Sequence, residues 1–264
     1  ANDQLFNRYG YLSFNPRTAV NAYNVIALFQ FALLMLIVPA LTATAISGER
    51  ERQTLDLMLC SSISTWSVIL GKLGVSIAHI MFLVVASLPI LGMVFLFGGI
   101  TFGEIMLLFL FYIVTALMAA SLGMFISTLF RRNVTAIITT YICLGIIGIG
   151  PVIALLIWGI FYERRMGGAI SYGTMASFLF PSPAFGFSSF VSGNSGFFGG
   201  IFVELQRYAD RDATWLRYFK PWMINGLFDL AFSGILICLS AWKLNPVKKR
   251  SRKVKKAGEN TGQV

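Results

Sequence analysis

The sequence predicts an all-α polytopic membrane protein with five transmembrane helices in this chain, a short helix between the first two, and an outer helical segment before the last. The chain has 264 residues, of which 56% are hydrophobic and 12% are charged, and its mean hydropathy is +0.74. Soluble domains are less apolar and about twice as rich in charge. No polar stretch is long enough to enclose its own core, so we expect no separate soluble domain.

Residues 1–23 are polar and aromatic, and we expect them to form a loop on the outer side of the membrane. They contain neither the charged start nor the apolar core of a signal peptide. The segment begins without Met, and five spans leave it outside when the other end of the chain is inside. We therefore expect the natural protein to carry a sixth span before Ala1, with a cleaved or truncated chain as the alternative.

Five apolar stretches are long enough to cross about 30 Å of hydrocarbon. Pro39 and Pro89 lie inside the first and second stretches, where proline favours a kink. The second stretch follows Ser64 and Thr65, which are preferred residues at a helix start. The predicted spans are residues 24–46, 68–99, 105–130, 134–161 and 222–242.

The third and fourth spans differ in how they are bounded and packed. A short turn over residues 98–104 precedes the third span, and we expect Glu104 in it to be a solvated loop residue. The fourth span carries Gly145, Gly148 and Gly150, which favour close helix packing, and Pro151, which favours a local break.

Residues 162–221 form a predicted outer segment in which charged residues surround two apolar pieces. Each piece is too short or too interrupted to span a membrane, so we expect re-entrant or interfacial helices. Their phenylalanines either line an exit for an amphiphile or anchor the chain in the interface. These residues are Phe178, Phe180, Phe185, Phe187, Phe190, Phe197 and Phe198.

Positive charge sets the predicted orientation. Arg131, Arg132 and the basic tail, residues 243–264, fall on the same side as the loop after the first span, and this side holds 13 of the 21 Lys and Arg residues. We therefore expect a multi-pass protein of the plasma membrane with a cytoplasmic C-terminus. The tail follows an apolar span directly, so we expect it to lie near anionic lipid, with no nucleic-acid partner.

The loop after the first span concentrates charge in an otherwise apolar chain. Gly48-Glu49-Arg50-Glu51-Arg52-Gln53-Thr54-Leu55 leads through a Ser/Thr turn to Gly71-Lys72-Leu73. At these residues the chain resembles the permease subunits of type-2 ABC exporters, in which an acidic-basic-Gly/Gln-Thr-Leu motif precedes a short coupling helix. Gln53 stands where glycine is common in that family, and Ser61-Ser62 where proline is common.

The resemblance implies that this loop docks on a cytosolic nucleotide-binding ATPase subunit. It also implies a second permease subunit, in a homodimer or heterodimer, and ATP and Mg²⁺ bound by the partner ATPase. From the residues alone, a helix over about 51–60 places Leu55, Met58 and Leu59 on one stripe, which suits a groove in another protein; a helix lying on lipid is the alternative. The candidate coupling residues are Glu49, Arg50, Glu51, Arg52, Gln53, Thr54, Leu55, Met58, Leu59 and Lys72.

Lys72 has two predicted arrangements. It either extends its ammonium group back to the interface or pairs with Glu49 or Glu51, and we favour the pair.

Catalytic and metal motifs are absent from the sequence. A P-loop needs G-x-x-x-x-G-K-[ST], and the one Gly-Lys pair, Gly71-Lys72, is followed by Leu and has Trp66 at the first glycine position. One histidine and three scattered cysteines suggest neither a metal site nor a disulfide framework. We therefore expect no cofactor in this chain and no ATPase activity of its own.

His79 and Asp229 are the ionisable residues that lie well inside predicted spans, and both are candidates for the transport pathway or a gate. For His79 the simpler reading is a polar contact between helices. For Asp229 it is a pair with Arg217, Lys220 or a neighbouring helix.

The leading functional hypothesis is the membrane subunit of an ATP-driven exporter. An ion-coupled secondary transporter or channel is the alternative, which would need ionisable groups near the midplane. A third alternative, a membrane-bound enzyme, would need a metal cluster, a nucleophile with its base, or paired acids, and the sequence shows none of these.

Overall fold

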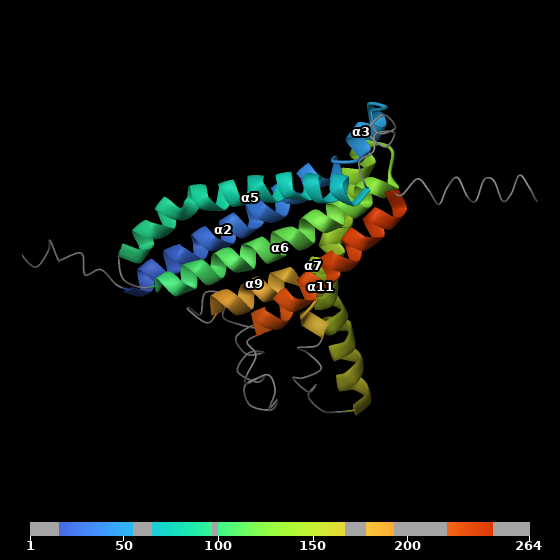
Figure 1. Cartoon of the computed structure of the whole chain (residues 1–264). Coiled ribbons are helices and arrows are strands. Elements are labelled where there is room, and N and C mark those ends of the chain that lie inside the picture. Colours follow the sequence, from blue (N-terminus) through green and yellow to red (C-terminus); the bar gives the residue numbers. More distant parts are fainter. Residues whose placement is uncertain (1–15, 55–64, 97–99, 167–177, 193–220, 245–264) are drawn as a thin grey trace, which may run out of the picture.

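The computed structural model describes residues 16–54, 65–96, 100–166, 178–192 and 221–244, and every regular element in these ranges is a helix (Figure 1). Five of the helices are long and apolar enough to cross a membrane, which confirms an all-α polytopic membrane protein. The helices are α2 (Pro16–Ala43), α3 (Ser47–Glu51), α5 (Thr65–Leu96), α6 (Phe102–Leu129), α7 (Asn133–Met166), α9 (Pro183–Ser192) and α11 (Pro221–Leu244).

Helix α6 is the centre of the bundle, and it packs most extensively against α11 and α2. Its interior face is built from small residues such as Ala116, Ala119 and Gly123, which let neighbouring backbones approach closely. A Cβ added at Gly123 would lie 2.1 Å from Oγ1 of Thr42 in α2, so only glycine fits there. The Tyr112 hydroxyl donates to the carbonyl of Ala27 at 2.7 Å and fixes the register of α6 against α2.

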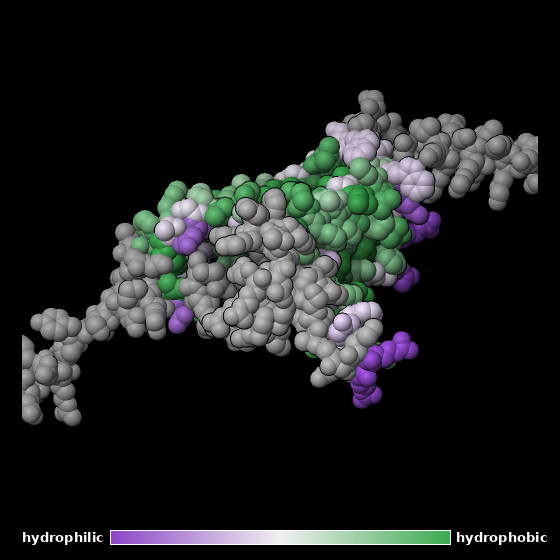
Figure 2. All heavy atoms as spheres, turned by 90° about the horizontal axis from the view of Figure 1, so that it is seen from below, coloured by the Kyte–Doolittle hydropathy of each residue, from purple (hydrophilic) through white to green (hydrophobic). Residues whose placement is uncertain are grey.

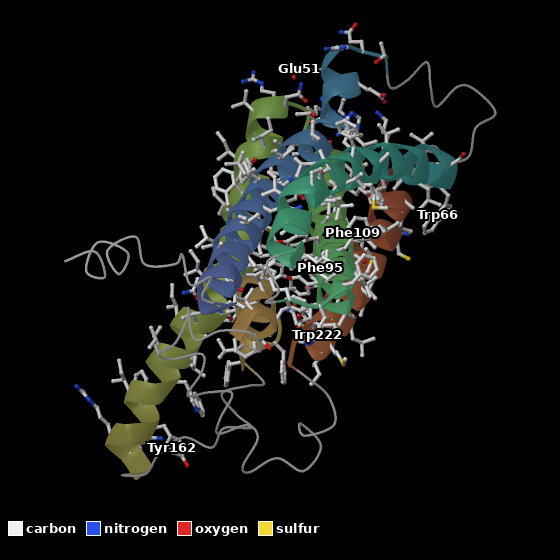
Figure 3. All side chains as sticks on the ribbon, turned by 90° about the vertical axis from the view of Figure 1, so that its left-hand side faces the viewer. Glu51, Trp66, Phe95, Phe109, Tyr162 and Trp222 are labelled. Atoms are coloured by element: carbon white, nitrogen blue, oxygen red, sulfur yellow. The ribbon has the colours of Figure 1, made fainter. Side chains whose placement is uncertain are left out.

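Helix α7 lies at the edge of the bundle, and its far end extends beyond the other helices (Figures 1 and 3). None of its most apolar window is buried inside the chain, whereas 61% of the corresponding window of α6 is. A Cβ added at Gly145 or Gly148 meets nothing within 4 Å, and at Gly150 only Ile146 of the same helix. The prediction that these glycines serve close packing is therefore wrong within one copy of the described chain.

Figure 2 shows apolar residues over the middle of the visible surface and the most hydrophilic described residues towards its ends. Figure 3 places Glu51 at one end of the structure and Tyr162 at the opposite end, on α7. This distribution is expected of a bundle whose middle faces hydrocarbon and whose ends face water.

The helix ends differ from the predicted ones. Helix α2 begins at Pro16, inside the predicted loop 1–23, because proline is favourable as the first residue of a helix and Arg17 does not stop one. Glu104, predicted to be a solvated loop residue, belongs to the first turn of α6. Its carboxylate accepts the Thr101 backbone N–H at 2.8 Å, and the Thr101 hydroxyl oxygen accepts the Glu104 N–H at 3.4 Å. This capping box was readable as Thr101-x-x-Glu104.

Helices α2, α5 and α7 continue through Pro39, Pro89 and Pro151, so the local break predicted at Pro151 is wrong. At two of these prolines an outside hydroxyl donates to the carbonyl three residues earlier: Tyr141 to Leu36, and Ser182 to Gly148 at 2.8 Å. Proline opens the preceding turn of a helix, and hydroxyl donors from neighbouring segments compensate for this.

Candidate functional site

The charged motif begins as a one-turn helix, α3, and residues 52–54 are not helical, so the predicted helix over about 51–60 does not begin at Glu51; its remainder, residues 55–60, lies outside the described residues. Glu51 is the last residue of α3. The N–H of Thr54 donates to Glu49 O at 2.9 Å and the N–H of Gln53 to Arg50 O at 3.2 Å, the paired bonds of a Schellman C-cap. The helix therefore stops where it was predicted to start. Leu55, Met58 and Leu59 lie outside the described residues, so their docking role stays a prediction.

Gln53 occupies the left-handed position of this cap, with φ 59°. Glycine adopts that conformation without the steric cost that a Cβ brings. The cap therefore gives a physical reason for the glycine that is common at this position in permeases that this chain resembles. Residues 51–54 are exposed, so the cap is presented to solvent or to a partner.

Arg50 and Glu51 attach α3 to the corner between α6 and α7. Nη1 of Arg50 donates to the carbonyls of Thr128 and Phe130, at 3.2 and 3.3 Å, at the C-terminal end of α6. The Glu51 carboxylate accepts the N–H of Asn133, the first residue of α7, at 3.2 Å. A cation at the C-terminus of a helix and an anion at an N-terminus both complement the helix dipole.

Ser127 of α6 binds the backbone at the start of α3. Its Oγ accepts the backbone N–H groups of Ile46 at 2.9 Å and of Ser47 at 2.8 Å, which are otherwise unpaired at a helix start. The Ser47 hydroxyl lies 2.7 Å from Oδ1 of Asn133. All these groups are buried or partly buried, so the bonds are shielded from water.

Lys72 of α5 completes the attachment. Its Nζ lies 2.5 Å from Oε1 of Glu49 and 2.5 Å from the carbonyl oxygen of Ala45. The predicted pairing with an acid of the motif is confirmed, and the acid is Glu49. The exposed fractions of the two side chains are 23% and 24%, so water weakens the pair only in part. Through Lys72, Arg50, Ser127 and Glu51, α3 is bonded to three long helices.

His79 and Asp229 are not brought together. His79 is exposed on α5, where one ring nitrogen lies 2.8 Å from Val75 O, and it borders a hollow of about 310 Å³ that Lys72 also lines. Asp229 is buried in α11, and neither carboxylate oxygen has a hydrogen-bond donor among the described residues. Two of its predicted partners, Arg217 and Lys220, lie outside those residues. The third prediction was a partner on a neighbouring helix, and no helix that the structure describes supplies one.

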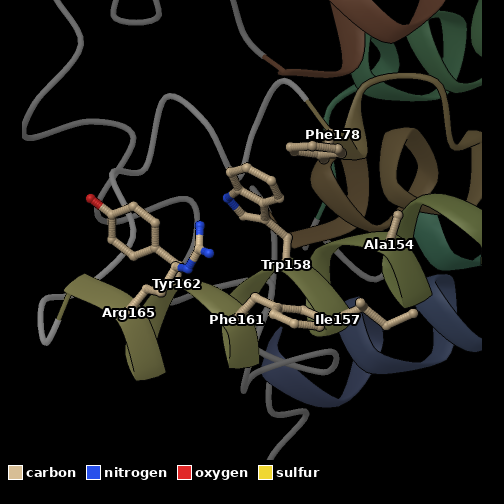
Figure 4. A pocket seen from close by; sticks show the side chains of 7 residues that line it. All are labelled: Ala154, Ile157, Trp158, Phe161, Tyr162, Arg165 and Phe178. Carbon is tan, nitrogen blue, oxygen red and sulfur yellow. The ribbon is translucent and has the colours of Figure 1, made fainter.

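The outer phenylalanines separate into two groups. Phe178 and Trp158, with ring centroids 6.1 Å apart, line a hollow of about 790 Å³ beside the far end of α7 (Figure 4). Phe185, Phe187 and Phe190 are instead core residues, and Phe187 stacks on Phe31 of α2 at 4.5 Å. For these three, both predicted roles, exit lining and interface anchoring, are wrong, because α9 folds back against the bundle. Phe180 is buried as well, and Phe197 and Phe198 lie outside the described residues.

A family model described as ABC-2 family transporter protein matches residues 3–162, more than half of the chain and most of its described helices. No curated protein sequence matches it. With its membrane-length helices and the charged corner after α2, the chain belongs to the ABC-2 family of transporters, as a multi-pass membrane permease.

Proposed function

We propose that this chain is the permease subunit of an ATP-driven exporter, and that a separate ATPase subunit drives it through α3 and residues 52–60. The observation that carries the proposal is the attachment of α3. Lys72 joins it to α5, Arg50 joins it to the end of α6, and Glu51 joins it to the start of α7. A push on this corner is transmitted to three spans at once, because each bond is made at or near a helix end.

ATP and Mg²⁺ belong to the partner ATPase in this proposal, since the sequence has no P-loop of its own. The exposed residues 52–54 and the Leu55–Met58–Leu59 stripe that follows form the contact surface for that partner. We place α3, the α6–α7 corner and the C-terminus on the cytosolic side of the plasma membrane, as the distribution of Lys and Arg favours.

We further propose that the permease works as a dimer that uses α7. Within one copy this helix fully buries no residue of its apolar window, and a Cβ at Gly145 or Gly148 would meet no described atom within 4 Å. Small residues spaced along a helix let a second helix approach closely in a membrane. The exposed apolar side of α7 therefore supports contact with a second copy of this chain or with a related permease.

The test separates docking from transmission. Purification from the native membrane is expected to bring down an ATPase. Leu55→Asp is expected to abolish this association by placing a charge in the docking stripe, a loss of about 2 kcal/mol or more. Glu51→Gln is expected to keep the ATPase bound while reducing ATP-dependent movement of a fluorescent label on α7, because it weakens the bond to Asn133.

The matched control is Arg164→Gln, which removes an exposed charge at the far end of α7. It is expected to change neither association nor movement. A chain that purifies without any ATPase, or an ATPase that stays bound to the Leu55→Asp variant, would contradict the proposed docking.

A further inference from the structure

The buried face of α11 is polar, although the helix is long and apolar enough to span a membrane. Asn225, Asp229, Ser233 and Ser240 recur along one face, and none exposes more than 2% of its surface. This face packs against α6 and α9. The opposite face, with Leu227, Ile235 and other apolar residues, is exposed.

Three buried oxygens on adjacent turns of this face have no donor among the described residues. They are both carboxylate oxygens of Asp229 and the side-chain oxygen of Asn225. Asn225 uses its amide nitrogen to donate to the carbonyls of Phe180 at 2.7 Å and Ser182 at 3.2 Å, so its oxygen acts only as an acceptor. On the other side, the Ser233 hydroxyl donates to Leu230 O at 2.8 Å and is not available to Asp229.

No charged group in the described part of the bundle neutralises Asp229. On α6, Glu104 caps the helix start and the Tyr112 hydroxyl donates to Ala27. On α5, Lys72 is bound to Glu49, and His79 is exposed beside Val75. Helix α9 carries no titratable side chain, and on α11 itself Lys243 is exposed fourteen residues away.

A bare carboxylate in such a place is strongly unfavourable, because burial removes water and no described residue replaces it. One proton resolves the charge and pairs two of these three oxygens, and it leaves the third as the carbonyl oxygen of a neutral carboxyl. Protonation removes the charge. It also gives the carboxyl an O–H group, which is a donor that needs an acceptor. Asn225 lies four residues earlier on the same helix face, the spacing at which side chains meet, and its oxygen is the acceptor without a donor.

We propose that Asp229 is a proton-binding site, in which the protonated carboxyl donates to the side-chain oxygen of Asn225 while α11 packs against α6 and α9. Any step that opens this packing to water releases the proton, since a hydrated carboxyl ionises at neutral pH. The permease therefore takes up one proton each time the packing closes.

Infrared spectroscopy of the purified full chain in lipid nanodiscs tests the protonation directly. At neutral pH the difference between the wild type and Asp229→Asn is expected to contain the C=O stretching band of a carboxylic acid, which shifts in D₂O. Ser240→Ala, a change at another buried residue of the same face, is expected to keep the band. Carboxylate bands in place of the acid band would overturn the proposal.

Thermal unfolding gives a second readout. The unfolded chain loses this proton above about pH 4 while the folded chain keeps it, so the stability of the wild type is expected to fall as the pH rises above about 4. Asp229→Asn is expected to lose that part of the slope, and His79→Gln to keep it. Stabilisation by Na⁺ or K⁺ at fixed pH, present in the wild type and lost in Asp229→Asn, would overturn the proton in favour of a metal cation.

Discussion

Arg50 and Glu51 are neighbours of opposite charge, and each is placed at a helix end whose partial charge it complements. The guanidinium meets the carbonyls at the end of α6, and the carboxylate meets the first N–H of α7. Exchanging the two charges would set each one against the dipole it now stabilises. The order of base and acid at Arg50 and Glu51 thus matches the two helix ends at the α6–α7 corner.

Ser127 is an uncharged residue of the corner, and its replacement is expected to lower the free energy of unfolding. Ser127→Ala leaves the N–H groups of Ile46 and Ser47 without an acceptor in a buried place, which costs about 1–3 kcal/mol. We expect a fall of several degrees in the unfolding temperature measured in detergent. Ser121→Ala is the matched control, because that buried hydroxyl bonds only within its own helix, to Met118. Equal losses in the two variants would contradict the role of Ser127.

Gln53 offers a change in the opposite direction. Gln53→Gly is expected to stabilise the chain by about 0.5–1 kcal/mol, because glycine adopts the left-handed φ of 59° without strain. Gln53→Ala retains a Cβ and is expected to be nearly neutral. Both are measured by thermal unfolding. A Gln53→Gly variant no more stable than Gln53→Ala would show that the Schellman cap is not strained.

At the level of whole helices, hydropathy predicted which segments span and missed where they end. Apolar runs located all five long helices, whereas caps decide their termini, as Pro16 does for α2 and Thr101 with Glu104 does for α6. The contacts between helices were even harder to predict from the sequence than the helix ends. The glycines that looked suited to close contact lie in α7, whereas the contacts that require glycine are at Gly123 and Gly186. Their partners, Thr42 and Asn225, are distant in sequence.

Helix packing at Gly123 can be tested against an open glycine. Gly123→Ala places a methyl group against Thr42 and the Ala43 backbone, so α2 and α6 must move apart, at a cost of about 1–3 kcal/mol. Gly145→Ala meets nothing within 4 Å among the described residues and is expected not to destabilise the monomer. The measurement is the fraction of each variant that elutes as folded protein, with its unfolding temperature. Normal stability of Gly123→Ala would contradict the close contact.

The candidate site divides in the same way. The pair of Glu49 with Lys72 was predictable, since both belong to one sequence motif. Ser127 and Asn133 were not, because they lie about eighty residues further along the chain and carry no charge that marks them. The predicted helix over 51–60 missed the Schellman cap because apolar spacing reports a face and contains no information on where a helix stops.

Taken as a whole molecule, the chain is asymmetric: α6 is enclosed by its neighbours, whereas no residue of the apolar window of α7 is fully buried, although one side of α7 packs against α2, α6 and α9. If α7 forms the dimer contact, cysteines on it are expected to cross-link two copies. Ile149→Cys, in a chain whose Cys60, Cys143 and Cys238 are replaced by Ser, is expected to give a disulfide-linked dimer in the membrane. The residue is 62% exposed.

Ile235→Cys on α11 is the matched control, since Ile235 is a similarly exposed apolar residue, at 59%, on a helix that already packs against α6 and α9. Cross-linking is read on a gel without reductant. A dimer with Ile149→Cys alone supports α7 as the interface, because lipid contact exposes both positions equally and only a protein partner distinguishes them. Equal cross-linking at the two positions, or dimers through Ile235→Cys alone, would exclude α7 and move the interface to another face of the bundle.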